Sequence, residues 1–199
     1  MAAGGGAPAS VRAMTPLRPW DALAADVVVD NPWVRLRRDT VRLPSGRVVD
    51  DFFVTEQPDV VLVFALTGAG EVVLVRQWRQ GRGGFYRELP GGLLDPGETP
   101  AGAAARELLE ETGYACEELR ELGRFGMDPT RTTSAIVAFL GLAARVESAP
   151  VADEQEELEV DLVPIDELVP LIRAGEISSA GTVATVYRAL DELGRRPGP

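Results

Sequence analysis

The sequence contains no histidine and no lysine, and its single cysteine is Cys116. Without histidine, a Ser-His-Asp or Cys-His catalytic arrangement and any imidazole general base are excluded. Without a second cysteine, no disulfide forms within the chain, and zinc sites built from cysteine and histidine are excluded as well. If the protein is an enzyme, we expect it to use carboxylates, arginines, hydroxyl groups and, where a metal is needed, a hard ion.

Long apolar runs are lacking too. No stretch approaches the ~20 apolar residues of a membrane-spanning helix, and the N-terminal sequence has no apolar segment of the signal-peptide kind. We therefore expect a cytoplasmic protein whose residues 1–16 form a disordered leader. The formal net charge of −11 argues against a nucleic acid or an anionic membrane as the main partner. A small anionic ligand, held by a few arginines or by metal, stays possible.

The apolar pattern predicts an α/β fold. With 199 residues and 45% apolar content, the chain is long enough for one domain, or for one domain with a small appendage. Residues 17–56 are expected to form a small β-layer, because Val34 and Leu36 alternate with arginines and Ser45-Gly46 suits a hairpin turn. A second hairpin with buried strands is predicted from V-V-L-V-F-A-L and V-V-L-V-R-Q-W on either side of T-G-A-G.

Helices are expected between the later strands. Thr99 is a suitable N-cap with Pro100 at the first helical position, and Gly113 stands where a glycine ends a helix. Residues 100–112 are therefore predicted to be helical, and a short helix is expected to begin or kink at Pro170. Further elements are expected as a short strand in F-Y-R-E-L-P, strands at about 118–126, 134–142 and 158–163, and a last helix at about 181–193. This mixture indicates helices packed on a mixed sheet.

The helix predicted over residues 100–112 carries three glutamates near its C-terminal end. Glu107, Glu110 and Glu111 stand at i, i+3 and i+4, so they share one helix face. Each like-charge pair costs roughly 0.2–0.5 kcal/mol, and the helix dipole disfavours carboxylates at this end. Taken alone, E-x-x-E-E is typical of a solvated acidic face. A dication among the carboxylates would make the cluster favourable, and Mg²⁺ is commonly held by one or two carboxylates plus substrate phosphates.

These glutamates belong to a longer motif. Gly92 is followed after five residues by Glu98, and after seven more by R-E-L-L-E-E-T-G-Y, from Arg106 to Tyr114. The motif resembles the Nudix box, G-x5-E-x7-R-E-U-x-E-E-x-G-U with U apolar or aromatic, at every fixed position. Such a match would arise by chance on the order of once in 10^5 sequences. The resemblance implies a Nudix hydrolase with a Nudix-like α/β/α sandwich over residues 57–195, cleaving nucleoside diphosphates linked to another moiety.

The resemblance also implies a metal site. Mg²⁺ is the expected cofactor, with Mn²⁺ as a possible substitute. The implied ligands are Glu107, Glu111, Glu110 and the carbonyl oxygen of Gly91. Glu98 and Arg106 would orient these ligands, so the catalytic residues expected in the box are Glu111, Glu110 and Arg106. A metal bridging two phosphates would activate a water and stabilise the leaving phosphate.

The resemblance extends over residues ~25–193 and is greatest to the ADP-ribose pyrophosphatase branch. V-L-V-R-Q-W-R followed by E-L-P-G-G resembles an upstream segment of that branch, so Arg79 is expected to contact a phosphate and Glu88 to brace the loop. Arg79 also fits an exposed arginine at a strand end. Pro129 lies some fifteen residues past the box, where a proline marks the branch. The branch usually has Pro-Gly there, and D-P-T-R in this chain puts the substrate in question more than the chemistry.

An acidic segment near the C-terminus carries a further prediction. A-D-E-Q-E-E-L-E-V resembles the acidic loop from which the branch supplies a catalytic glutamate. Glu156 is the first candidate and Glu154 the second, although an acidic run also fits a solvated loop. The general base is therefore left open among Glu156, Glu154 and a box glutamate.

The β-layer of residues 17–56 resembles the N-terminal element that these enzymes exchange between subunits. That resemblance implies a homodimer in which each adenosine pocket draws residues from both chains. Trp33, Arg35 and Arg37 are candidates to line such a pocket, with an aromatic ring stacking on a base. Core packing is the favoured role for Trp33.

The implied function is Mg²⁺-dependent hydrolysis of ADP-ribose to AMP and ribose 5-phosphate. Hydrolysis of another nucleoside diphosphate sugar, such as GDP-mannose, is the alternative within the same class. A non-catalytic sensor of ADP-ribose is the alternative of another class, and the complete box and the lack of a basic helix-turn-helix segment argue against it. The expected partner is a small nucleotide sugar, with no nucleic acid and no membrane.

Overall fold

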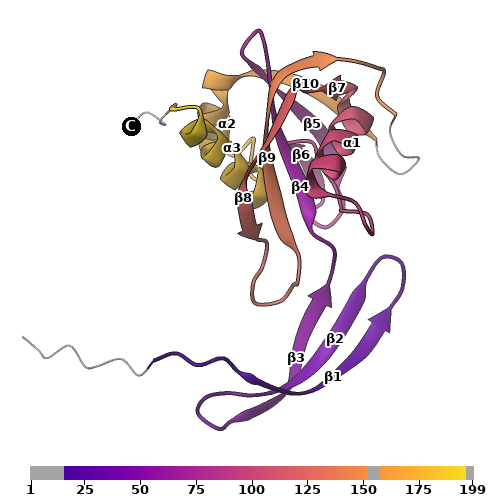
Figure 1. Ribbon diagram of the computed structural model, residues 1–199, viewed down its shortest axis with the longest axis vertical. Helices are drawn as coiled ribbons and strands as arrows, with labels where there is room; N and C mark the ends of the chain where they lie inside the picture. Colours follow the sequence, from indigo (N-terminus) through magenta and orange to yellow (C-terminus); the bar gives the residue numbers. More distant parts are fainter. Residues whose placement is uncertain (1–15, 152–156, 196–199) are drawn as a thin grey trace, which may run out of the picture.

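The computed structural model describes residues 16–151 and 157–195. Figure 1 shows a three-stranded sheet that projects from a larger α/β body. In chain order the elements are β1 (Asp21–Asp30), β2 (Arg35–Arg42), β3 (Val48–Glu56), β4 (Val60–Thr67), β5 (Glu71–Arg79), β6 (Gly84–Glu88), α1 (Pro100–Thr112), β7 (Tyr114–Ala115), β8 (Glu118–Gly126), β9 (Ala135–Val146), β10 (Leu158–Pro164), the 3-10 helix η1 (Ile165–Glu167), α2 (Leu168–Ala174) and α3 (Ala180–Glu192).

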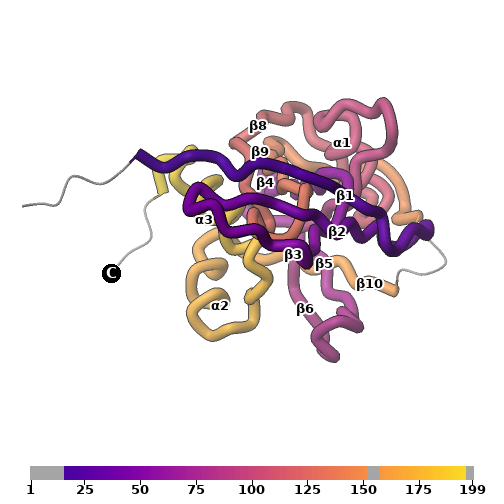
Figure 2. The backbone as a smooth tube through the Cα atoms, turned by 90° about the horizontal axis from the view of Figure 1, so that it is seen from below, coloured from indigo at the N-terminus to yellow at the C-terminus, as the bar shows by residue number. Residues whose placement is uncertain are grey.

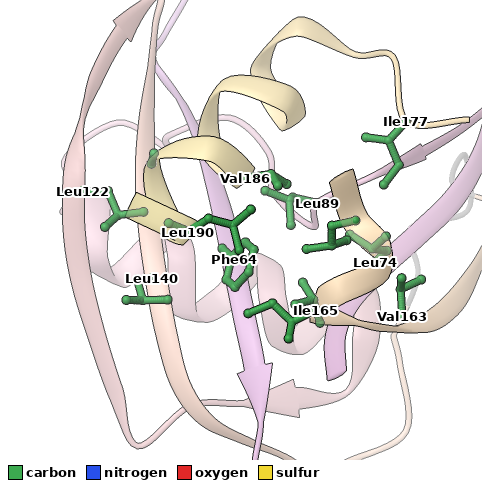
Figure 3. Packing of buried hydrophobic residues seen from close by; sticks show 14 residues of the cluster. Phe64, Leu74, Leu89, Leu122, Leu140, Val163, Ile165, Ile177, Val186 and Leu190 are labelled. Atoms are coloured by element: carbon green, nitrogen blue, oxygen red, sulfur yellow. The ribbon is translucent and has the colours of Figure 1, made fainter. Parts of the chain in front are cut away.

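The larger sheet is mixed and has helices on both faces. Its strand order is β10-β5-β4-β9-β7, with β6 paired to β5 and β8 paired to β9. The pairing of β4 with β9 is parallel, whereas the other pairings are antiparallel. One hydrophobic cluster packs against α1, and the other packs against α2 and α3. Figure 3 shows the second cluster, in which Phe64 of β4 lies near Val186 and Leu190 of α3. The predicted α/β/α sandwich is confirmed.

Helix α1 begins and ends where its capping residues predict. The Thr99 hydroxyl accepts a hydrogen bond from the Gly102 N–H at 3.1 Å, and Pro100 occupies the first turn. At the other end Gly113 has a φ of 73°, a left-handed conformation that favours glycine, and its N–H donates to the Leu109 carbonyl. The helix therefore presents its glutamates from a defined position beside β4.

The N-terminal sheet has little core of its own. All ten residues of β1 are exposed, and in Figure 2 the three strands cross beneath the larger body. The Thr55 N–H donates to the Arg131 carbonyl at 2.7 Å, and the Thr133 N–H donates to the Thr55 carbonyl at 3.1 Å. A three-stranded sheet needs a covered hydrophobic face for stability. Its exposed apolar residues include Leu23, Val27, Val28, Val29, Trp33, Val34, Val48 and Phe53.

Some boundaries differ from the sequence-based ones. Helix α2 begins at Leu168, so Pro170 lies in its first turn, where a missing N–H is tolerated. Strand β9 continues to Val146, because a bulge with Ala143 at a φ of 51° lets the chain go on to pair with β7. The predicted leader, residues 1–16, lies outside the described residues except for residue 16.

Candidate active site

The loop after β6 is held against strand β4 by backbone hydrogen bonds. The Val63 N–H donates to the Pro90 carbonyl at 2.9 Å, and the Val61 N–H donates to the Gly92 carbonyl at 2.8 Å. Successive peptide groups of an extended chain face opposite sides. The Gly91 N–H, between these two residues, faces helix α1, where it donates to Glu111.

Glu111 of α1 meets this loop. Its Oε2 accepts a hydrogen bond from the Gly91 N–H at 2.8 Å, and the residue is only 3% exposed. A Cβ atom at Gly91 would lie closer than 3.0 Å to the Val61 carbonyl, a strand backbone that cannot yield. Glycine is therefore required at position 91 for the loop to reach both β4 and Glu111.

Glu107 lies one turn earlier, against the next glycine. A Cβ atom at Gly92 would lie closer than 3.0 Å to the Glu107 carboxylate, so this carboxylate occupies the space that the glycine leaves. Both glutamates open onto a pocket of about 430 Å³. The pocket is lined by Val60, Arg79, Gly91, Gly92, Leu93, Asp95, Arg106, Glu107 and Glu111.

Arg106 connects the carboxylates of the motif. Its Nε and Nη2 donate to Glu98 at 3.0 and 2.9 Å, and its Nη1 donates to Glu107 at 2.8 Å and to Glu110 at 3.1 Å. The hydrogen bond from Arg106 holds the pKa of the Glu98 carboxyl below its ordinary value. The same partners, Glu98 first, raise the pKa of the Arg106 guanidinium. One cation therefore offsets much of the repulsion within the cluster.

Glu110 is placed differently from the other two box glutamates. Its side chain is 49% exposed and bonded to Arg106, and it does not line the pocket. Its role as a metal ligand and catalytic residue stays a prediction. The structure thus separates Glu107 and Glu111, which face the pocket, from Glu110, which lies on the outer flank of the helix.

The donor set of the pocket fits a hard dication. The described residues contain no group of three or more carboxylate, histidine or cysteine side chains that could hold a metal by themselves. The pocket is lined by two glutamates, Glu107 and Glu111, and by Gly91, whose carbonyl is the predicted third ligand. Mg²⁺ suits such a set, because it is commonly bound by one or two carboxylates and completes its octahedron with water and substrate phosphates.

Arg79 stands beside these glutamates at the end of β5. Its Nε donates to Glu88 Oε2 at 2.6 Å, and Glu88 is buried at the end of β6. The structure therefore brings the predicted phosphate contact into the same pocket as Glu107 and Glu111. Glu88 is thus the ion-pair partner of Arg79, and its role in bracing the loop stays a prediction.

The other predicted substrate residues lie away from this pocket. Arg37 of β2 is bonded to Asp39 and Glu56. Pro129 is exposed on the loop between β8 and β9. Trp33 is 77% exposed, so the interpretation of Trp33 as a core residue is wrong for the chain taken singly. The reason is that, among residues 16–151 and 157–195, no second layer covers this ring.

Glu154 and Glu156 lie outside the described residues. Val151, the last described residue before them, donates its N–H to the Glu110 carbonyl at 2.9 Å. Sequence reasoning missed Val60 and Asp95, which also line the pocket. Asp95 falls on a variable position of the motif. Its carboxylate lies 4.0 Å from the Arg106 guanidinium, a contact that the spacing of the motif residues does not predict.

Comparison with known proteins agrees with this geometry. Residues 56–185 match the NUDIX domain family, and residues 20–55 match the nucleoside diphosphate sugar hydrolase N-terminal domain. The chain therefore belongs to the NUDIX domain family and is a Nudix hydrolase. Nudix hydrolases generally use divalent metal ions. No helix in the described parts of the chain is long and apolar enough to span a membrane.

Individual relatives narrow the class. The methanol dehydrogenase activator of Bacillus methanolicus is 35% identical over 162 residues, covering 80% of this chain and 86% of that protein. The ADP-ribose pyrophosphatase of Bacillus subtilis (strain 168) is 30% identical over 172 residues, covering 85% and 92%. The crystal structure of an ADP compounds hydrolase has the same fold, with a TM-score of 0.79 over 92% of this chain and 100% of that chain at 22% identity. This chain is thus a Nudix hydrolase that is similar to ADP-ribose pyrophosphatases.

The contact between Gly92 and Glu107 leads to a prediction. Gly92→Ala is expected to raise the concentration of divalent metal ion needed for half-maximal activity about 10-fold, because the new Cβ displaces the Glu107 carboxylate. The size of this effect is that of losing a contact that supports a metal ligand. Tm should change little, since the displaced group is the end of a flexible side chain. Gly68→Ala, with no atom near its added Cβ, is the control. An unchanged metal requirement in Gly92→Ala would contradict the placement of Glu107.

Proposed function

We propose that this chain hydrolyses the pyrophosphate bond of ADP-ribose in a Mg²⁺-dependent reaction, which yields AMP and ribose 5-phosphate. The observation that carries the proposal is that Glu107, Glu111 and Arg79 line one pocket. Two carboxylates and a guanidinium in the same pocket suit a metal-bound diphosphate. The similarity to the Bacillus subtilis ADP-ribose pyrophosphatase supports ADP-ribose as the substrate.

Each residue of the pocket has a distinct role in this proposal. Glu107, Glu111 and the Gly91 carbonyl would hold the ion, which when bound supplies Lewis-acid stabilisation of phosphate oxygens and a more acidic water. Arg79 donates hydrogen bonds to the diphosphate, and Glu88 keeps its guanidinium in position. Arg106 positions Glu107, with which it shares a hydrogen bond.

We propose Glu156 as the general base, ahead of Glu154 and a box glutamate. The contact of Val151 with the Glu110 carbonyl supports a base from this acidic segment, because it brings the chain before the segment to the glutamate-bearing part of α1. Glu156→Gln should lower kcat and remove the acidic limb of the pH profile of kcat. An unchanged acidic limb in that variant would assign the proton transfer to another carboxylate.

The exposed apolar N-terminal sheet supports the proposal of a homodimer. A second copy that covers Val27 and Val29 would supply the missing layer, and it could place Trp33 and Arg37 at an adenosine pocket. Sedimentation at micromolar concentration should give twice the chain mass of 21.3 kDa. A monomer that is fully active on ADP-ribose would remove this part of the proposal.

A substrate panel tests the function directly. Product release would be measured for ADP-ribose, ADP-glucose, GDP-mannose and UDP-glucose with Mg²⁺, with EDTA and with EDTA followed by excess Mg²⁺. We expect ADP-ribose to have the highest kcat/KM, no turnover in EDTA and recovery on addition of metal. A higher kcat/KM for GDP-mannose would establish the alternative substrate instead. Turnover of no member of the panel would overturn the proposal.

A further inference from the structure

A second pocket adjoins the catalytic one. It has a volume of about 350 Å³. Its lining residues are Arg79, Arg82, Tyr86, Glu88, Ser178, Ser179 and Ala180. Arg79 lines both pockets, so a ligand whose diphosphate contacts Arg79 lies next to this second pocket, hereafter the Arg82 pocket.

Arg82 is held on a tight turn between β5 and β6. The Arg82 and Gly83 N–H groups both donate to the Arg79 carbonyl, at 3.0 and 2.9 Å. Gly83 has a φ of 65°, which favours glycine, and the turn can close for that reason. The Arg82 Nε donates to the Tyr86 hydroxyl at 3.3 Å. Arg82 is exposed, and this hydrogen bond ties its guanidinium to Tyr86 of β6 at the protein surface.

The charge of the Arg82 pocket is not balanced. Arg79 is paired with Glu88, whereas Arg82 makes no ion pair with a carboxylate of the described residues. The other lining groups include the hydroxyls of Tyr86, Ser178 and Ser179, all of which can donate hydrogen bonds. Ser179 makes no side-chain cap on α3, so its hydroxyl is not used in capping the helix.

A neighbouring pocket also contains arginines, but there they are paired with carboxylates. It has a volume of about 540 Å³ and also contains two arginines. There Arg76 is paired with Glu159, and Arg87 is paired with Asp161 and Glu176. The positive charges of both arginines in that pocket are therefore compensated by carboxylates of the same chain. In the Arg82 pocket, a guanidinium that has no carboxylate partner among the described residues lies beside hydroxyl donors, and this combination matches a phosphate group.

We infer that the Arg82 pocket is a subsite for one further phosphate of the substrate, beyond the diphosphate that is cleaved. Its relation to the catalytic pocket rests on the proposed function. The same chemistry is supplied by a third phosphate of a longer polyphosphate chain or by a phosphate ester on a sugar. Substrates with the additional phosphate would therefore be selected over simple nucleoside diphosphate sugars.

Binding of inorganic ions tests the subsite without catalysis. Calorimetry at a fixed excess of Mg²⁺ would compare tripolyphosphate with pyrophosphate. The wild-type protein is expected to bind tripolyphosphate about 10-fold more tightly, the scale of a charge-assisted hydrogen bond. In Arg82→Gln this ratio should fall to about 2-fold or less, with pyrophosphate affinity retained. Arg76→Gln, in the neighbouring pocket, should keep the wild-type ratio. Equal ratios in the wild type and Arg82→Gln would overturn the inference.

Two substrate pairs distinguish the sources of the phosphate. We would measure kcat/KM for diadenosine triphosphate against ADP-ribose, and for ADP-ribose 2′-phosphate against ADP-ribose, in both proteins. If one of these two kcat/KM ratios is lower in Arg82→Gln than in the wild type, the inference is supported, and that pair of substrates identifies the source of the phosphate. If both ratios are unchanged, the Arg82 pocket is not a substrate subsite. If no compound is hydrolysed, the proposed function fails, and the tripolyphosphate ratio alone decides the inference.

Discussion

Replacement of Glu111 by glutamine is expected to lower kcat/KM about 10^3-fold, the effect of removing several kcal/mol of metal-dependent transition-state stabilisation. Glu111 is buried beside the pocket, and its carboxylate already accepts the Gly91 N–H. Glutamine keeps the size and one acceptor oxygen, so the fold and this hydrogen bond should persist. Steady-state kinetics on ADP-ribose, together with thermal unfolding, would separate the loss of activity from a loss of stability.

Glu110→Gln is the matched comparison for this prediction. It removes the same charge from the same helix, but the Glu110 carboxylate is half exposed and lies outside the pocket. We expect its effect on kcat/KM to be about 10-fold, the scale of an outer contact. Equal losses in the two variants would show that Glu110 moves into the metal site when substrate binds. A larger loss in Glu110→Gln than in Glu111→Gln would contradict the site described above.

Arg106→Gln is expected to lower kcat/KM about 100-fold, because it removes the hydrogen bond that positions Glu107. The same change leaves Glu98, Glu107 and Glu110 without their shared cation. Their repulsion should lower Tm by about 5 °C. Activity and thermal unfolding at pH 7 would measure the two effects. Arg124→Gln, an arginine with exposed ion pairs on β8, is the control and should change neither.

The pH dependence of stability gives this prediction a second readout. Arg106 lowers the pKa of Glu98 in the folded protein, so the folded state binds fewer protons there than the unfolded state. The contribution to stability is present above the ordinary glutamate pKa and is lost as the pH falls through the lowered one. The stability difference between the wild type and Arg106→Gln should therefore shrink as the solution is made acidic. A constant difference down to low pH would contradict the role of this pair.

Elements with local signals were predictable from the sequence. Helix α1 has its N-cap, its first-turn proline and its terminal glycine within the segment itself, so its bounds follow from local chemistry. Strand β1 was not distinguished within the predicted β-layer, because its exposed residues lack the alternation of a half-buried strand. Strand β9 is longer than predicted because its last residues pair with β7, a contact that depends on the fold.

The sequence by itself determined the chemistry of this protein. It excluded an imidazole general base and a Cys-His arrangement, and the helical period placed Glu107, Glu110 and Glu111 on one face. Only the tertiary structure decided which of them line the pocket, because that depends on β4, the glycine loop and Arg79 of β5, which pack there from outside the helix. Those contacts hold Glu107 and Glu111 toward the pocket and leave Glu110 on the solvent side. The helical period determines which side chains share a face of α1. Which of those side chains line a pocket depends on the segments that pack against the helix.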